Sequence, residues 1–305
     1  MRHKENISMK SNIYKTSHLL FLSLTILWMA GSGCTKQRAD MPTWIEVDSL
    51  SFNPIGTSLT SSSRFTDVWV YANDNLVGGF ELPARIPVLS EGNTSLILYP
   101  GIQVNGLTAL RSPYLKIQRF EQTINLVPGE TIHLNPEFKI DSLLLNSPNN
   151  FKFNEKFQNS SSAIAPTTGA YGDFQIYNSP DAFEGGMCGL LRHNGAENTM
   201  AQIENTQWIT LPKGDAGGIF FEMNYKCNTS FTVSLLAKPD DGGAIQKIGV
   251  IGINESADWN KIYITLSNSV GSFTSGDQFK LAIGYTRQPA IATQEVYLDN
   301  LQIYY

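Results

Sequence analysis

Apolar and polar residues alternate with a period of two along most of the chain after its first forty residues. The alternation is clearest in four segments, 221–227, 231–235, 262–266 and 279–285. In the first of these (FEMNYKC) the odd-numbered residues are apolar and the even-numbered ones polar. This period is typical of β-strands that bury one face, and several such strands require a second sheet to cover their apolar sides. The sequence therefore predicts an all-β protein of stacked sheets.

The N-terminal block, residues 43–138, predicts short strands separated by turns that contain Gly, Pro, Asn or Asp. Tight turns favour these residue types because of their backbone preferences. The predicted elements are a hairpin over 68–79 around Asn73–Asn75, a strand over 82–89, a turn at 91–93, a strand over 95–99 that Pro100-Gly101 ends, and a hairpin over 123–134 around Pro128-Gly129. Short strands at this spacing indicate an immunoglobulin-like β-sandwich.

The C-terminal block, residues 149–305, follows a linker predicted at 139–148. Its last strand, predicted over 295–305, is informative because its apolar residues are even-numbered before Asp299 and odd-numbered after Asn300. A β-bulge at these two residues would bring all the apolar side chains onto one inward side. The block therefore predicts a second β-sandwich whose last strand contains a bulge.

Two stretches of the chain resemble known β-domains. Residues 74–102 have a Pro-bearing strand, a Gly turn and a strand that ends at Gly, and they resemble PEGA-like and carboxypeptidase-regulatory-like sandwich repeats, although the PEGA tetrapeptide is absent. The second block resembles the jelly rolls of carbohydrate-binding modules and their galactose-binding-like relatives in these segments: FNEKFQN (153–159), WITLP (208–212), FEMNYKC (221–227), DWNKIYITL (258–266) and VYLDNLQIYY (296–305). The resemblance implies a spacer followed by a ligand-binding jelly roll.

Residues 1–33 have the composition of a secretory signal peptide. A basic stretch is followed by the apolar run 19–30 (LLFLSLTILWMA) and then by Gly31-Ser32-Gly33. The run is shorter than the roughly 20 apolar residues that a membrane-spanning helix needs, and this order of regions is that of an export signal. We therefore expect the mature protein to begin after residue 33.

Cys34 follows this small-residue segment and resembles the lipidated cysteine of a bacterial lipobox. The resemblance implies an acylated N-terminus, a tether over 34–42 and a cell-envelope location. Thr35, rather than Asp, implies passage to the outer membrane, on either its periplasmic or its exposed face. Gly31 stands where a lipobox typically has Leu, so ordinary cleavage stays open.

Composition narrows the classes of partner. The chain is 42% hydrophobic and 16% charged, which is too apolar for a disordered chain and too polar for a protein with many membrane spans. Its formal net charge is −5, and the leader removes more basic than acidic residues from the mature body. Without a basic stripe there is nothing to neutralise a phosphate backbone, so we expect no nucleic-acid partner.

Aromatic side chains are the candidate ligand contacts, because sugars stack on flat aromatic faces while polar groups fix their hydroxyls. The candidates are Tyr171, Tyr177, Phe183, Trp208 and Trp259. The first three lie in or near a Gly-, Ser- and Pro-rich stretch, 160–186, and the two Trp residues flank predicted strands. The alternative is that the Trp residues belong to the core and the others pack within loops.

The jelly-roll resemblance also suggests a structural calcium site with oxygen ligands from Asp299 and Glu155. The alternative is that Asp299 caps the bulge through backbone amides and Glu155 is a solvated turn residue. No cofactor is required by the pattern. Cys188 and Cys227 are the thiols that follow Cys34, and a disulfide between them stays open because two cysteines alone do not reveal pairing.

Catalytic motifs are missing from the sequence: there is no His-Glu-x-x-His, no Gly-x-Ser-x-Gly and no phosphate loop. After the leader only His133 and His193 remain, and His133 falls on the polar side of its predicted strand. We therefore expect a non-enzymatic, lipid-anchored envelope protein whose jelly roll binds carbohydrate. An assembly lipoprotein that binds another envelope protein is the alternative, and a glycan hydrolase is a third hypothesis, because a pair of carboxylates needs no linear motif.

Overall fold

The computed structural model describes residues 41–54, 60–140, 151–184, 186–196, 198–214, 218–273 and 277–305. Residues 42–305 form one compact unit. Within the described residues nearly all regular structure is strand, and the one α-helix among them is the single turn α3 (Ser267–Gly271). The prediction of an all-β chain is confirmed. None of these residues belongs to a helix long and apolar enough to cross a bilayer. The predicted signal peptide and Cys34 lie outside the described residues.

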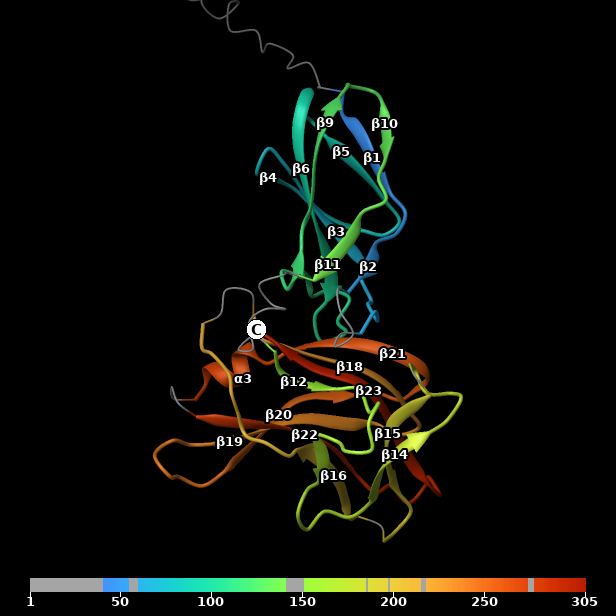
Figure 1. The fold of residues 1–305 in the computed structure, drawn as a ribbon, viewed down its shortest axis with the longest axis vertical. Helices are drawn as coiled ribbons and strands as arrows, with labels where there is room; N and C mark the ends of the chain where they lie inside the picture. The colour runs from blue at the N-terminus through green and yellow to red at the C-terminus, as the bar shows by residue number, and fades with distance from the viewer. Residues whose placement is uncertain are drawn as a thin grey trace, which may run out of the picture. The chain divides into compact units, whose positions relative to one another are not determined.

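The first sandwich has a five-stranded sheet in the order β4-β3-β6-β7, with β9 also paired to β6 (Figure 1). Two three-stranded sheets, β10-β1-β5 and β2-β11-β8, form its remaining strands. The strands are β1 (Thr43–Val47), β2 (Ser51–Asn53), β3 (Asp67–Ala72), β4 (Asn75–Glu81), β5 (Ala84–Val88), β6 (Gly92–Gln103), β7 (Arg111–Pro113), β8 (Ile117–Gln118), β9 (Phe120–Leu126), β10 (Thr131–His133) and β11 (Glu137–Ile140). Their inward residues, such as Ile45, Val68, Ile86 and Leu98, pack into one core.

The first predicted hairpin is confirmed, because β3 and β4 pair around Asn73 and Asp74. Both turn residues have positive φ, 48° and 63°, which is what a two-residue hairpin turn requires. His133 lies on the exposed side of β10, as its alternation with Ile132 and Leu134 predicted, and its Nδ1 is 3.3 Å from Glu46 Oε2.

The expected strand end at Pro100-Gly101 is wrong, because β6 continues to Gln103. On one side of β6, β9 pairs with residues 92–98 and β7 with residues 101–103. Pro100 falls between these partners and its carbonyl accepts a hydrogen bond from Tyr114 N–H at 2.7 Å, so its missing N–H breaks neither ladder. A Cβ at Gly101 would lie 2.5 Å from Asp67 Cβ, which explains the glycine.

The second expected hairpin, around Pro128-Gly129, is also wrong. The strand before it, β9, pairs with β6, whereas the strand after it, β10, pairs with β1 in parallel. The turn therefore carries the chain from one sheet to another. A Pro-Gly sequence predicts that the chain reverses, but it does not predict which strand the reversed chain will join.

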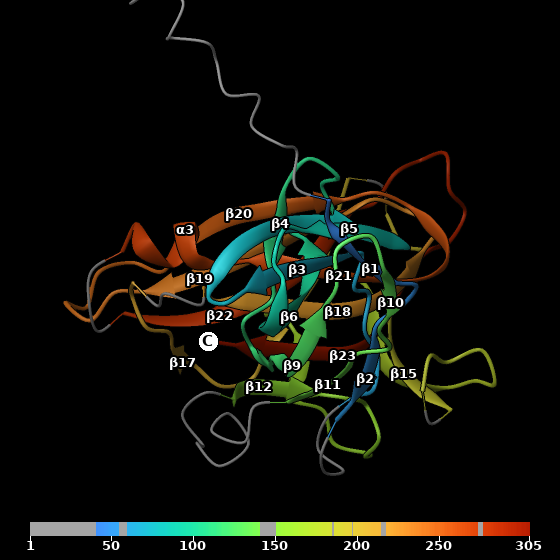
Figure 2. The same cartoon turned by 90° about the horizontal axis from the view of Figure 1, so that it is seen from above.

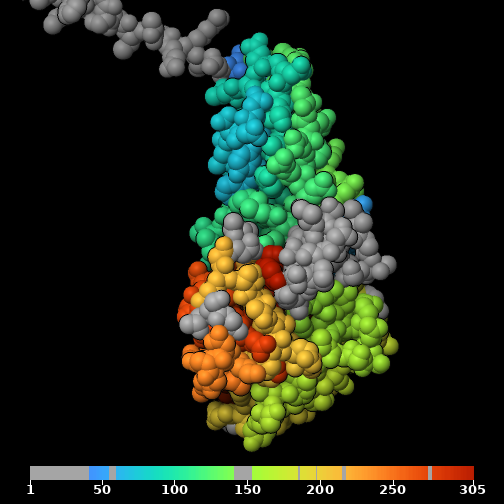
Figure 3. All heavy atoms as spheres, turned by 60° about the vertical axis from the view of Figure 1, so that its left-hand side comes forward, coloured from blue at the N-terminus to red at the C-terminus, as the bar shows by residue number. Residues whose placement is uncertain are grey.

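The jelly roll consists of two six-stranded sheets that share one core. The first sheet has the order β14-β15-β23-β18-β21 with β12 beside β23, and the second has the order β13-β16-β22-β19-β20 with β17 beside β22. Figure 2 shows β18 and β23, which pair with each other, side by side. Figure 3 shows the atoms of both sandwiches as spheres. The strands are β12 (Phe151–Glu155), β13 (Ile164–Pro166), β14 (Asp173–Asn178), β15 (Met187–His193), β16 (Met200–Asn205), β17 (Ile209–Thr210), β18 (Phe220–Cys227), β19 (Phe231–Lys238), β20 (Gln246–Ile253), β21 (Ser256–Thr265), β22 (Gln278–Thr286) and β23 (Gln294–Tyr304).

The predicted bulge in β23 is confirmed. Opposite it, Glu222 pairs with Gln302 and Asn224 with Asp299, so β23 has one residue more than β18 over this interval. Asn300 has a φ of 50°. Apolar residues on both sides of the bulge belong to the core between the sheets, namely Val296, Leu298, Leu301 and Ile303. The extra residue therefore restores one inward face, as the change of parity predicted.

A buried ion pair lies in the jelly-roll sheet at the place where the first sandwich packs on it. Glu222 of β18 and Lys261 of β21 lie 2.7 Å apart, with side chains 5% and 4% exposed. Both also bond to the first sandwich: Glu222 accepts a hydrogen bond from the Tyr114 hydroxyl, and Lys261 Nζ donates to the Ser62 carbonyl at 2.7 Å. Burial, and then the charge of Glu222, raises the pKa of Tyr114 well above its usual value, so the phenol keeps its proton and donates.

We predict that Glu222→Leu lowers the free energy of unfolding by about 3–5 kcal/mol, because it leaves the Lys261 charge buried without its carboxylate. The double variant Glu222→Leu, Lys261→Met should lose much less, since no unpaired charge remains. Urea denaturation followed by circular dichroism measures both values. A double variant as unstable as the single one would show that the ion pair is not what makes the position sensitive.

Candidate functional site

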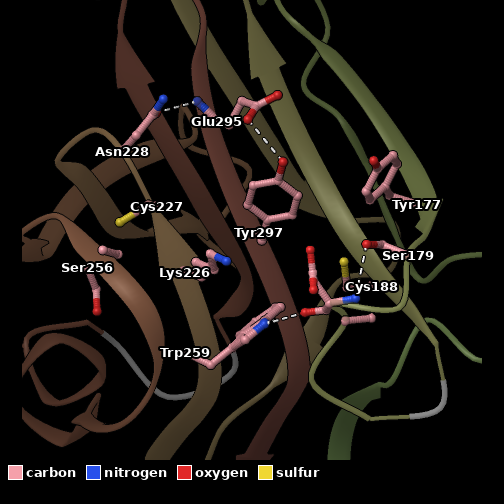
Figure 4. A pocket seen from close by; sticks show the side chains of 13 residues that line it. Tyr177, Ser179, Cys188, Lys226, Cys227, Asn228, Ser256, Trp259, Glu295 and Tyr297 are labelled. Carbon is pink, nitrogen blue, oxygen red and sulfur yellow. Dashed lines mark hydrogen bonds between the residues drawn. The ribbon is translucent and has the colours of Figure 1, made fainter.

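A pocket of about 250 Å³ opens on the outer face of the jelly-roll sheet that contains β23. We call it the outer-face pocket. Residues of five strands and their adjoining loops line it: Tyr177, Ser179, Asp181, Ala182, Cys188, Lys226, Cys227, Asn228, Ser256, Ala257, Trp259, Glu295 and Tyr297. Figure 4 shows the labelled side chains around the hollow. Tyr297 points outward because its neighbours Val296 and Leu298 point into the core.

Three aromatic rings from separate strands meet in this pocket. Tyr177 of β14 packs edge-on against Tyr297 of β23, with ring centroids 6.0 Å apart. Trp259 of β21 faces them across the pocket (Figure 4). Its indole N–H donates to the Asp181 carbonyl at 2.7 Å, and Phe183 packs on its ring at 5.7 Å. The indole is therefore held by a hydrogen bond and by a neighbouring ring before any ligand arrives.

Glu295 organises the polar side of the pocket. One carboxylate oxygen lies 2.7 Å from the Arg192 guanidinium, and the other accepts a hydrogen bond from the Tyr297 hydroxyl at 3.0 Å. The Glu295 backbone N–H donates to Asn228 Oδ1 at 2.8 Å. Burial, and then the hydrogen bond to Glu295, raises the pKa of Tyr297 to about 12. The phenol is neutral at physiological pH and its orientation is fixed.

The charges that line the pocket are balanced. Glu295 is neutralised by Arg192, while Asp181 and Lys226 contribute one charge of each sign. Among the described residues Lys226 makes no ion pair, and its side chain points toward the hollow in Figure 4. A pocket with aromatic walls and little net charge suits a neutral ligand with many hydroxyl groups.

The structure brings together some of the predicted contact residues and separates others. Tyr177 and Trp259 line the outer-face pocket, and Phe183 supports Trp259 from behind. Tyr171 is 58% exposed but stacks on His193, with centroids 6.5 Å apart, and is not part of the lining. Trp208 lies on the other sheet with Lys238 and Lys280 over its ring. The alternative that the two Trp residues are core is wrong, since both are partly exposed.

Tyr297, Glu295 and Lys226 line the pocket but were not among the residues expected from sequence. The sequence signal that could have found them is the alternation of residues along a strand. All three residues are neighbours of core residues on β18 or β23, so their side chains must point outward. Parity identifies the outward side, but it does not reveal which outward residues meet in one place. That depends on the pairing of β23 with β15 and β18.

The open question of a disulfide is answered by the pairing of the strands. Cys188 and Cys227 are both free thiols and both buried. Their strands, β15 and β18, lie on opposite sides of β23, so two strand spacings, roughly 10 Å, separate them. A disulfide needs Cα atoms within about 7 Å. Burial raises the pKa of Cys188 to about 12, which makes its thiol unreactive.

Asp299 and Glu155 serve separate hydrogen-bond networks. Asp299 accepts the backbone N–H groups of Asn300 at 2.8 Å and Glu184 at 3.2 Å, as the capping alternative expects. Glu155 accepts the Phe157 N–H at 2.6 Å and is only 7% exposed, so it is not a solvated turn residue. Among the described residues no group of three His, Cys, Asp or Glu side chains could hold a metal ion. Calcium binding stays a prediction.

No family model and no curated protein matches the sequence. Among solved structures, the chain is similar to a carbohydrate-binding module of the β-sandwich superfamily with promiscuous specificity, at 13% identity and a TM-score of 0.43, covering 87% of this chain and 98% of that one. It is also similar to a family 11 module from Clostridium thermocellum in complex with a β-1,3-1,4-mixed-linked tetrasaccharide (13%, TM-score 0.38, 52% of this chain and 97% of that one). A third is TmCBM61 in complex with β-1,4-galactotriose (12%, TM-score 0.33, 51% and 97%).

Asp299 makes a pH-dependent contribution to stability that can be measured. Burial raises its pKa to about 7 from the ordinary 3.8, and the two backbone amides only partly oppose this. Between about pH 4 and pH 7 the folded state therefore binds more protons than the unfolded state, and the contribution of this group falls as the pH rises through that window. Because one pKa unit is worth about 1.4 kcal/mol, the change amounts to a few kcal/mol.

We predict that the wild-type protein gains stability relative to Asp299→Asn as the pH is lowered from 7 to 4, since the amide side chain does not titrate. Urea midpoints measured at one-unit pH intervals on both proteins give the difference directly, and other titrating groups cancel. A difference that stays constant across this range would show that Asp299 is ionised at low pH like an exposed carboxylate.

Proposed function

We propose that the outer-face pocket binds carbohydrate noncovalently. The observation that carries the proposal is the meeting of Tyr177, Tyr297 and Trp259 from three strands in one hollow with charged and amide side chains between them. The C–H faces of a sugar ring pack on aromatic faces, and its hydroxyl groups exchange hydrogen bonds with such polar side chains. The fixed indole lowers the entropy that binding would otherwise cost.

The size of the pocket limits the ligand. Its volume, about 250 Å³, lies just below the range of about 300–1,000 Å³ typical of pockets for drug-sized molecules. We infer that one sugar unit enters the hollow and that any further units of a longer glycan lie outside it. The balanced charges favour a neutral unit, because the pocket offers an acidic sugar no net positive charge: Asp181 offsets Lys226, and Arg192 is already paired with Glu295.

We predict that a glycan array probed with the soluble 41–305 protein identifies neutral sugars, and that Trp259→Ala weakens binding to them more than tenfold. Tenfold corresponds to about 1.4 kcal/mol, which is the scale of one stacking contact. Trp208→Ala is the matched control, because it removes a partly exposed Trp outside the pocket and should bind as the wild type does.

Two outcomes would count against this function. Absence of binding to any glycan at high protein concentration would contradict it, and so would a Trp208→Ala variant that loses as much affinity as Trp259→Ala. Circular dichroism and thermal denaturation of both variants distinguish lost binding from lost folding.

We further propose that the protein is an outer-membrane lipoprotein acylated at Cys34. The support is the basic stretch, the apolar run 19–30 and the small residues before Cys34. An acyl chain holds a protein through its buried methylene groups, each worth about 0.8 kcal/mol. Attachment concentrates the jelly roll near the membrane, which favours capture of envelope or extracellular glycans.

Metabolic labelling with a fatty-acid analogue tests the anchor. Wild-type protein should incorporate the label and fractionate with membranes, whereas Cys34→Ser should lose the label and be released, because serine cannot take the thioether-linked lipid. Label retained by the Cys34→Ser protein would refute acylation at this residue.

A further inference from the structure

A second hollow lies where the two sandwiches meet, and we call it the junction pocket. It has a volume of about 460 Å³, which is within the range of small-ligand sites. One wall consists of Arg64, Thr66, Gln103 and residues 105–107 of the first sandwich, and the other consists of residues from β18, β20 and β21 of the jelly roll and the loop after β20. It shares none of its lining residues with the outer-face pocket.

Hydrogen bonds between the sandwiches hold these walls in place. The Asn105 backbone N–H donates to the Tyr263 carbonyl at 2.7 Å, and its side-chain oxygen accepts the Thr265 N–H at 3.0 Å. The Arg64 backbone N–H donates to the Tyr263 hydroxyl at 3.0 Å. The pocket is therefore formed without a ligand, and binding would require little rearrangement.

The charge of the junction pocket is positive. Arg64 and Lys261 are the charged residues of its lining. Lys261 is neutralised by Glu222, whereas the Arg64 guanidinium donates to the amide oxygen of Asn260 and toward the Lys261 carbonyl, neither of which carries a charge. No carboxylate among the described residues pairs with Arg64, although acidic residues outnumber basic ones, 27 to 22, in the whole chain. The guanidinium charge is thus available to a ligand.

We propose that the junction pocket binds a small hydroxylated carboxylate of the sugar-acid class. A guanidinium matches a carboxylate through two parallel hydrogen bonds. The Tyr225 hydroxyl accepts a bond from Asn260 Nδ2 at 3.1 Å, and burial raises its pKa, so its own proton is free to be donated to a ligand oxygen. The amides of Gln103 and Asn254 are placed for further hydroxyl groups, and Leu107 supplies an apolar wall.

Ligand-observed NMR titration of the 41–305 protein with galacturonate and glucuronate, compared with galactose and glucose, tests the proposal. These titrations use the Trp259→Ala variant, in which binding at the outer-face pocket is weakened. The sugar acids should bind to this variant at least tenfold more tightly than the neutral sugars. In that background Arg64→Leu should weaken sugar-acid binding at least tenfold. Arg64→Lys should weaken it less, because it keeps the charge but loses the planar fork.

The matched control is Arg119→Leu, since Arg119 is a surface arginine of the first sandwich that pairs with Glu121 at 3.0 Å. It should bind sugar acids within twofold of its parent. Equal affinity for acids and neutral sugars would overturn the proposal, and so would an Arg64→Leu protein that is folded by circular dichroism and binds as its parent does. Loss of neutral-sugar binding in Trp259→Ala alone bears only on the outer-face pocket.

Discussion

The central strands of the jelly roll, β18 and β23, have buried side chains on both faces, so both faces must pack against other parts of the protein. In β18 every residue except Lys226 is buried, and in β23 the buried residues continue on both faces after Asp299. The inward side chains fill the core between the two sheets. The side chains on the outer face of the sheet pack against the first sandwich. Phe220 and Tyr263 of the jelly roll belong to the core cluster of that sandwich. The first sandwich therefore covers one part of the outer face of this sheet and leaves the other part, which we call the open part, exposed to solvent.

The covered part contains polar groups, and each must find a partner there. Glu222, Lys261 and Gln302 are buried under the first sandwich or beside it. Glu222 and Lys261 pair with each other, and Gln302 bonds with Asn154 and the Tyr304 hydroxyl. A network in which every buried polar group has a partner favours one arrangement of the two sandwiches, because the loss of one partner leaves a buried charge or polar group without a hydrogen bond. The open part keeps Lys226, Tyr297 and Glu295 beside water, and there the outer-face pocket forms.

Sequence periodicity was sufficient for the parts of the fold that depend on one strand at a time. It identified the inward faces of β18, β19, β21 and β22, and the parity change located the bulge at Asp299–Asn300. It failed where the outcome depends on which strand becomes a neighbour. The Pro128-Gly129 turn joins two sheets, and Cys188 and Cys227 lie across β23 from each other. Two of the three pocket rings, Tyr177 and Trp259, were expected by residue type, but Tyr297 became visible only through the register of its strand.

The contacts around the buried ion pair determine what kind of joint connects the sandwiches. A hinge needs contacts that can exchange partners at little cost. Rotation of the sandwiches apart would instead break the bonds from Tyr114 to Glu222 and from Lys261 to Ser62. It would also expose Phe220 and Tyr263, which lie in the core of the first sandwich. The Asn105 and Tyr263 bonds add backbone contacts that would break in the same motion. We therefore expect the two sandwiches to move as one body. A pull on the chain at Thr43, where β1 begins, would then turn the jelly roll together with the first sandwich.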